Sequence, residues 1–206
     1  MYPQMVKYPF YILFHPFDGF WDLKYDNKGK LRISLAILLL LTITTILQRQ
    51  YSGFVVNFNN PTELNSINEL KYIVLPFILW CVSNWSLTTL MDGEGKFKEI
   101  LTATGYALLP LMLVHLFNTI LSNMITLQEA TFYYFLESFA FLWFLWLLFI
   151  GTMTIHQYNV LKTIVTMALT LVVMGVIMFL GLLFFSLMQQ MLGFVLSIYN
   201  ELSLRM

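Results

Sequence analysis

The sequence predicts an all-α integral membrane protein, a bundle of five transmembrane helices with interfacial helices at both ends. Composition is the first observation: of 206 residues, 59% are hydrophobic and only 11% are charged, whereas a soluble domain has about 25% charged residues. Patterning is the second, because long uncharged runs of the kind that span a bilayer cover residues 33–48, 72–91, 100–128, 138–161 and 163–200. Together they exclude a soluble enzyme and a disordered chain.

The first predicted span covers residues 31–47 and is unusually short. Its uncharged run lies between Arg32 and Arg49 and holds 16 residues, which reach only about 24 Å in a helix, against a hydrocarbon core of ~30 Å. We therefore expect both arginine side chains to extend toward the membrane surface.

The second, third and fourth spans are expected at residues 72–91, 100–126 and 131–153. Pro76 and Pro110 fall inside the second and third spans, and each is expected to bend its helix because proline cannot donate the backbone hydrogen bond. Since few residues separate the third and fourth spans, these two are expected to form an antiparallel hairpin.

The fifth uncharged run is too long for one crossing. Its 38 residues would form a helix of about 57 Å, roughly twice the bilayer core. We therefore predict a span over residues 163–185, a break near Ser186, and an amphipathic tail over residues 186–206 on the outer face.

Charge predicts the orientation, because cytoplasmic segments of membrane proteins are enriched in Lys and Arg. With the amino terminus in the cytoplasm and the carboxyl terminus extracellular, eight basic residues lie inside and three outside, namely Arg49, Lys71 and Arg205. We therefore expect a multi-pass protein of the cell membrane. Its segment 1–30 is predicted to lie along the cytoplasmic face, anchored in the interface by aromatic side chains, with Phe14, Phe17, Phe20 and Trp21 as the candidates.

Intramembrane polar residues give the first candidate site. Glu137 is the carboxylate deepest in an apolar run, and a charged group at that depth often marks a function. Across the predicted hairpin it faces the region of Asn118 and Asn123, with His115 nearer the middle of the third span and Asn84 in the second. Such a cluster has two interpretations that the sequence leaves open: helix packing through hydrogen bonds, or a site for a solute or proton.

The loop between the second and third spans gives the second candidate site. The run of residues 91–97, MDGEGKF, lacks the spacing of a phosphate-binding loop. We expect Gly93 or Gly95 to end the second span in a left-handed cap. The charged residues of the loop are alternative candidates for docking a cytosolic partner, and they are Asp92, Glu94, Lys96 and Lys98.

The same loop, followed by the run TGYALLP at residues 104–110, resembles the Yip-domain family, the Ypt-interacting-protein-like membrane proteins. The resemblance covers roughly residues 10–185. It implies a five-helix bundle with a cytoplasmic amino terminus, and the compact build is similar to the bacterial branch. Bacterial members often accompany binding-protein-dependent sugar importers, so the resemblance implies such a partner.

The sequence favours a non-enzymatic accessory or scaffold subunit, because it contains no catalytic constellation. Expected partners are the lipid bilayer and other membrane subunits, with the permeases of a carbohydrate importer, an ABC transporter complex, implied by the resemblance. We expect no cofactor, no metal and no nucleic acid. The first alternative is a small-solute transporter or channel with a polar site around Glu137, His115 and Asn118, and the second is a protein that shapes membranes through its interfacial ends.

Overall fold

The computed structural model describes residues 2–57 and 65–205, and it describes side chains for residues 7–57 and 65–201. The predicted all-α fold is confirmed: within these residues the regular structure is helical, and five helical stretches are long and apolar enough to cross a membrane. The helices are α1 (Tyr2–Phe14), α2 (Pro16–Tyr25), α3 (Leu31–Tyr51), α4 (Ser66–Leu90), α5 (Phe97–Ala107), α6 (Leu109–Leu121), the short 3-10 helix η2 (Leu127–Glu129), α7 (Ala130–His156) and α8 (Val160–Arg205).

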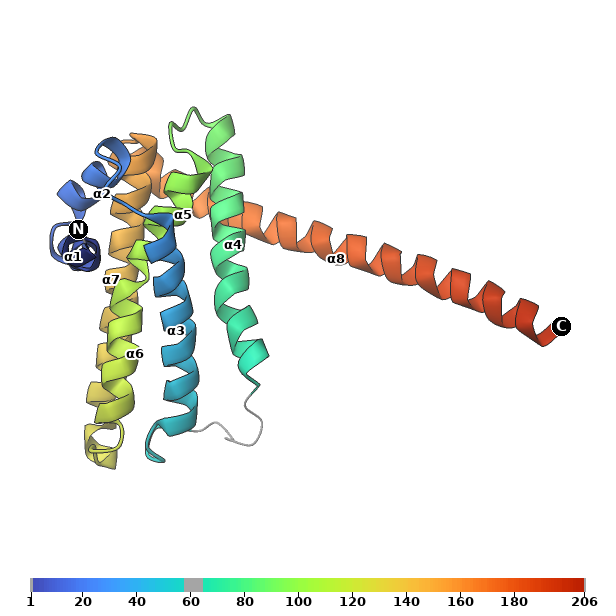
Figure 1. Ribbon diagram of the computed structural model, residues 1–206, viewed down its shortest axis with the longest axis horizontal. Helices are drawn as coiled ribbons and strands as arrows, with labels where there is room; N and C mark the ends of the chain where they lie inside the picture. Colours follow the sequence, from blue (N-terminus) through green and yellow to red (C-terminus); the bar gives the residue numbers. More distant parts are fainter. Residues whose placement is uncertain (1, 58–64, 206) are drawn as a thin grey trace.

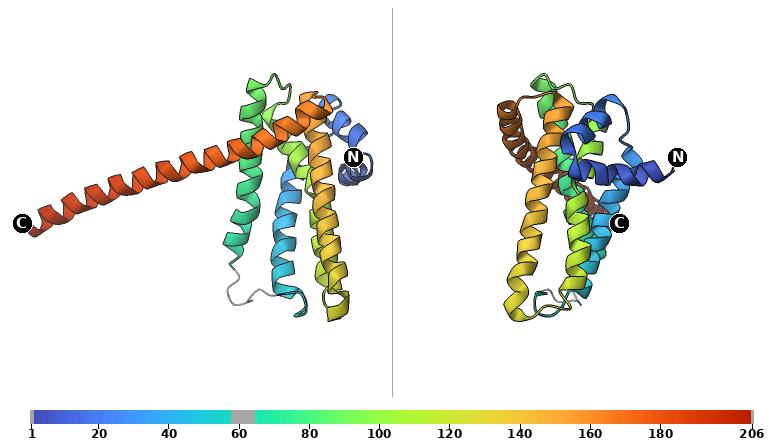
Figure 2. Two further views of the ribbon diagram at one scale, coloured as in Figure 1. Left: turned by 180° about the vertical axis from the view of Figure 1, so that it is seen from behind. Right: turned by 90° about the vertical axis from the view of Figure 1, so that its left-hand side faces the viewer.

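The bundle consists of α3, α4, the α5–α6 pair and α7, which run side by side (Figures 1 and 2). Helix α3 packs on α5 and α6, and α7 packs on both α5 and α6. The core between them is apolar and closely packed, with fully buried Tyr106, Ala140, Leu147 and Ile150. Burial of these side chains fixes how the polar residues of neighbouring helices meet.

Helix α3 is longer than predicted. It continues past the expected end at residue 47 to Tyr51 and has 21 residues, about 31 Å at 1.5 Å per residue. The extra turn carries Arg49, which forms an ion pair with Glu69 of α4, whose side chain is almost completely buried. Arginine is a good helix former, so its charge ends the apolar run but not the helix.

Pro110 produces the expected interruption of the third span. Helix α5 ends at Ala107 and α6 begins at Leu109, because a proline in the first turn of α6 has no N–H to bond back into α5. By contrast, α4 continues through Pro76 as one helix of 25 residues.

The amino-terminal helices α1 and α2 pack against the bundle rather than lying free. Phe20 of α2 is fully buried, and a Cβ on Gly151 of α7 would lie 3.2 Å from its ring. Phe20 is therefore a core residue, and its prediction as an interfacial anchor is wrong. Phe14, Phe17 and Trp21 are exposed, at 68%, 52% and 52% respectively, as side chains facing lipid headgroups would be.

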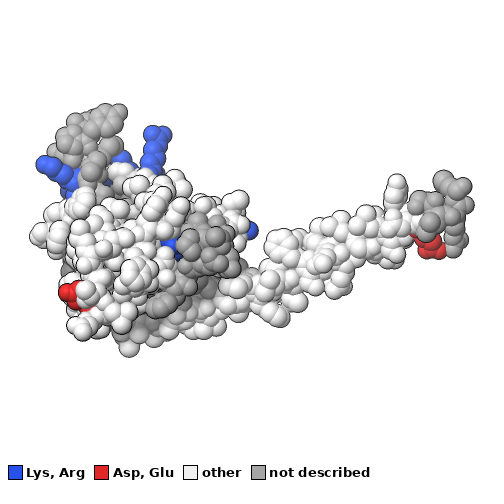
Figure 3. All heavy atoms as spheres, turned by 90° about the horizontal axis from the view of Figure 1, so that it is seen from below, with Lys and Arg blue, Asp and Glu red and all other residues white. Residues whose placement is uncertain are grey.

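Helix α8 differs most from expectation. It is a single helix of 46 residues, without the predicted break near Ser186. It starts against α4, runs transverse to the bundle and extends far beyond it (Figure 1). Most of its side chains are exposed, and its visible surface carries no charge until close to the carboxyl end (Figure 3). Most of the surface of this long, largely uncharged helix is therefore available to lipid or to other proteins.

Candidate functional site

The structure gathers polar side chains into two clusters in opposite halves of the bundle. The Glu137 cluster joins α3, α6 and α7 and contains Gln48, His115, Asn118, Tyr133 and Glu137. The His156 cluster joins the glycine loop, α4, α7 and α8 and contains Gly95, His156, Asn84 and Thr170. The predicted association of Glu137 with Asn118 and His115 is thus present as geometry, whereas Asn84 belongs to the other cluster.

Both carboxylate oxygens of Glu137 have partners. Oε1 accepts hydrogen bonds from Asn118 Nδ2 at 3.0 Å and from Gln48 Nε2 at 2.5 Å, and Oε2 lies 3.3 Å from His115 Nε2. Gln48 Nε2 also donates to the Tyr133 hydroxyl at 2.7 Å. Gln48 was not expected at this site, because it lies beyond the end of the predicted first span.

The hydrogen bonds around His115 fix its tautomer. Thr45 Oγ1 lies 3.3 Å from His115 Nδ1 but donates its one proton to Leu41 O at 2.9 Å. Nδ1 must therefore carry a proton and donate it to Thr45. His115 Nε2 lies 3.3 Å from Glu137 Oε2, so the carboxylate has a polar neighbour on each of its two oxygens inside the membrane-spanning bundle.

A polar pocket of about 210 Å³ opens beside this cluster. Gln48 and Tyr133 belong to both, so the pocket reaches the side chains that bind Glu137. The other lining residues are Thr45, Arg49, Ser52, Val56 and Asn57. Asn123, predicted as a member of the cluster, lies outside it: its Nδ2 donates to Tyr51 O and Thr119 O, both at 2.9 Å, and ties the end of α6 to the end of α3.

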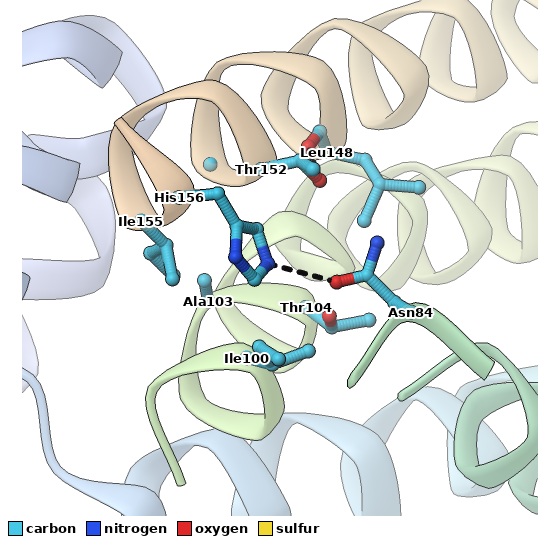
Figure 4. Close-up of a pocket in the computed structure, with 9 residues that line it drawn as sticks. Asn84, Ile100, Ala103, Thr104, Leu148, Thr152, Ile155 and His156 are labelled. Carbon is cyan, nitrogen blue, oxygen red and sulfur yellow. Dashed lines mark hydrogen bonds between the residues drawn. The ribbon is translucent and has the colours of Figure 1, made fainter. Parts of the chain in front are cut away.

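The His156 cluster is a directed chain of hydrogen bonds, of which Figure 4 shows the one between His156 and Asn84. The Gly95 N–H donates to His156 Nδ1 at 3.3 Å, so Nε2 carries the proton and donates to Asn84 Oδ1 at 3.0 Å. Asn84 Nδ2 donates to Thr170 Oγ1 at 3.4 Å, and Thr170 donates to Thr166 O at 2.7 Å. The imidazole is therefore neutral, and four segments of the chain are joined through buried groups.

A small cavity of about 10 Å³ lies beside this cluster, lined by His156, Asn84, Thr104 and Thr152 among others. That volume is about enough for one water molecule and not for a larger ligand. Among the described residues, no group of three or more His, Cys, Asp and Glu side chains could hold a metal ion.

The glycine loop is shaped differently from the predicted cap. The residue in the left-handed region is Asp92, with φ of 55°, and no glycine among the described residues has a positive φ. The Gly93 N–H donates to Thr88 O at 2.8 Å, which is the closing bond of a Schellman motif with Asp92 at its left-handed position. The prediction that a glycine adopts the left-handed conformation is therefore wrong.

The two glycines are required instead by the close approach of His156. A Cβ on Gly93 would lie 2.7 Å from His156 Nδ1, and one on Gly95 would lie 2.6 Å from His156 Cε1. Any side chain at either position would displace the imidazole from its hydrogen bonds. Tyr158 closes the loop from the other side, because its hydroxyl donates to Met91 O at 3.0 Å. Burial, with the charge of Asp92, raises the pKa of Tyr158, so its hydroxyl keeps the proton that it donates.

Of the four charged residues predicted to dock a partner, Glu94 has a partner within the chain. Lys24 of α2 reaches across so that its Nζ lies 2.9 Å from both Glu94 Oε2 and Ile155 O. The second bond places a cation on a carbonyl at the end of α7, where it also interacts favourably with the helix dipole. Asp92, Lys96 and Lys98 are exposed, and the Lys96 N–H donates to Glu99 Oε2 at 3.1 Å, which caps the start of α5.

The run at residues 104–110 also has a packing role. A Cβ on Gly105 would collide with Ser34 of α3, and the Ser34 hydroxyl donates to Leu101 O at 2.8 Å. Tyr106 is 1% exposed, and its hydroxyl accepts the Lys30 N–H at 3.3 Å. This run therefore lets α3 and α5 approach closely. Its Tyr106 also holds the backbone at Lys30, just before α3 begins.

Comparison with known proteins supports one assignment. The model of the Yip1 domain matches residues 10–183, which include both clusters, the glycine loop and the first half of α8. Comparisons with curated proteins and with solved structures give no significant match. Because the match covers most of the chain, and the structure has the membrane-spanning helices of a multi-span family, the chain belongs to the Yip1 domain family.

Proposed function

We propose that the protein is a non-enzymatic accessory subunit that docks on another membrane complex through α8. The observation that supports this proposal is the length of the uncharged part of α8, residues 163–200. This part is about 57 Å long. Beyond residue 185 its polar side chains are Ser186, Gln189, Gln190, Ser197 and Asn200, which lie within about a third of the helix circumference. The rest of the circumference is an apolar face that lipid or protein has to cover.

Lipid covers only part of that length. A helix tilted by about 40°, near the upper end of the observed range, crosses a core of ~30 Å in about 39 Å. About 18 Å of uncharged helix, with a wide apolar face, then remains to be covered. The transmembrane helices of another subunit would provide an apolar surface of that kind, with interhelical packing as the attractive force.

As the partner we propose a permease of a binding-protein-dependent carbohydrate importer. Its support is the resemblance to the bacterial members of the family. The proposed orientation has the amino terminus in the cytoplasm and the carboxyl terminus outside, supported by the basic residues near the glycine loop and α2. Tags at both ends, read for their compartment, test that orientation.

Co-purification from native membranes in a mild detergent tests the docking. Gly175 and Gly193 are 18 residues apart, which is five full turns, so they share one face of α8. A Cβ at either position meets nothing within 4 Å in the chain, so replacing both with Ile leaves the isolated protein intact. We expect this double variant to lose the partner, and Phe184→Leu on the opposite face to retain it. Recovery of the wild-type protein alone would overturn the proposal.

A second candidate function is a small-solute or proton pathway through the Glu137 cluster. One observation favours it: the pocket of about 210 Å³ shares Gln48 and Tyr133 with that cluster. Flux into liposomes that contain the purified protein tests it. Glu137→Gln would abolish such flux, and absence of flux in the wild type would exclude this function.

A further inference from the structure

A groove of about 330 Å³ lies between α2 and the end of α7, away from both polar clusters. Helix α2 supplies Phe17, Asp18 and Trp21 to one wall. The other wall includes Thr154 of α7 and the two residues that follow the helix, Gln157 and Tyr158. The lining thus combines aromatic rings with a carboxylate and uncharged polar groups.

The position of the groove places it at the surface of the membrane. Helix α7 ends at His156 and α8 begins at Val160, and both helices are apolar enough to span a bilayer. The short loop between two such helices lies where the hydrocarbon ends. Phe17 and Trp21 are exposed, and aromatic side chains are enriched at this depth, the interface between membrane and water. In a bilayer the groove is therefore surrounded by lipid headgroups.

A negative group lines the groove and a positive group lies beside one of its lining residues. The Asp18 side chain is exposed and has no hydrogen bond or ion pair with any residue that the structure describes. Lys162 does not line the groove, but its Nζ lies 4.1 Å from the centroid of the ring of Tyr158, which does. Phe17 and Trp21, each 52% exposed, line the same groove as Asp18.

This arrangement matches a headgroup that carries both charges. An ammonium group is attracted to a carboxylate and to the faces of aromatic rings, and a phosphate is attracted to a lysine. We propose that the groove binds the headgroup of a zwitterionic phospholipid, with the ammonium at Asp18 and the phosphate at Lys162. An anionic headgroup without an amine would leave Asp18 without a cation to pair with, which disfavours it.

Lipid competition tests the proposal directly. The purified full-length protein is incubated with equal amounts of phosphatidylethanolamine and phosphatidylglycerol of matched acyl chains, and bound lipid is counted by native mass spectrometry. We expect about twofold to fivefold enrichment of phosphatidylethanolamine, the ratio that one exposed ion pair between the ammonium and Asp18 supplies. Asp18→Asn is expected to reduce this ratio toward one, because the ion pair is lost.

Asp26→Asn is the matched control, since Asp26 lies just after α2, pairs with Lys28 and does not line the groove. It should keep the preference of the wild type. Lys162→Gln should weaken the binding of both lipids equally, because both contain the phosphate. The proposal is overturned if the wild type shows no preference, or if Asp18→Asn retains it. These results do not depend on docking by α8, which the glycine variants test separately.

Discussion

His156 Nε2 donates a hydrogen bond of 3.0 Å to Asn84 Oδ1, and this bond joins the last residue of α7 to the last third of α4. Both side chains are about 1% exposed. A buried donor that loses its acceptor costs more free energy than the bond itself contributes. The pair therefore indicates where the bundle is most sensitive to a single substitution.

Asn84→Leu is expected to lower the free energy of unfolding by about 1–2 kcal/mol, because it leaves the His156 N–H and the Thr170 hydroxyl without this partner. Unfolding in increasing sodium dodecyl sulfate, followed by circular dichroism, measures the change. In a double-mutant cycle with His156→Phe the two losses should be strongly non-additive. Additive losses would mean that the bond contributes nothing.

Gly95→Ala is expected to destabilise the protein and to disorder the loop, because the new methyl group would overlap the His156 ring. Gly181→Ala is the matched control: a Cβ there meets nothing within 4 Å, and alanine favours a helix over glycine by up to about 1 kcal/mol. The midpoint temperature of thermal unfolding in detergent should therefore fall for Gly95→Ala and stay the same or rise for Gly181→Ala. Equal effects would contradict the packing role of Gly95.

Glu137→Gln should preserve the Glu137 cluster, because the amide oxygen can accept from Gln48 and Asn118 while its NH₂ donates to His115 Nε2. Imidazole ¹⁵N shifts should then show His115 with its proton on Nδ1. Glu137→Leu should instead cost about 1–3 kcal/mol, since Gln48 and Asn118 each lose the carboxylate acceptor and keep only their bonds to Tyr133. A leucine variant as stable as the glutamine variant would show that these hydrogen bonds do not matter.

Lys24→Met should loosen the end of α7, because the Lys24 side chain is only 9% exposed and binds both Glu94 and Ile155 O. Hydrogen exchange should accelerate in the loop at residues 157–159 and in the glycine loop. Lys28→Met is the control: Lys28 hydrogen-bonds to Asp22 and Asp26, which raises its pKa, but its side chain is 50% exposed. Unchanged hydrogen exchange in the Lys24→Met variant would show that Lys24 does not hold the end of α7 to the glycine loop.

Much of the fold could be predicted from the sequence, because membrane spans depend on composition and run length. Pro110 marked the interruption between α5 and α6 for a local reason, the missing N–H. The break near Ser186 could not be judged in this way. Nothing in the chemistry of Gln189 and Gln190 ends a helix, and the expected stop came from the thickness of a bilayer rather than from the residues.

The sites were less predictable, because they depend on which helix faces meet. Phe20 and Phe17 have the same chemistry, and the first is buried because it packs into the core, where its ring lies against Gly151 of α7. His156 lies 72 residues from Asn84 along the chain, so no spacing rule connects them. One signal was present in the loop: two glycines separated by a single residue often mark a place where another group approaches the backbone closely.

The contact between Lys24 and Ile155, 131 residues apart in sequence, sets an order of events during biosynthesis. As the chain leaves the ribosome, α2 is made early, but its binding site on α7 is complete only after the fourth apolar segment has emerged. Until then α1 and α2 remain at the membrane surface, with the rings of Phe20 and its neighbours exposed. The packing of α1 and α2 on α7 is consequently a late step, which follows the insertion of the preceding segments.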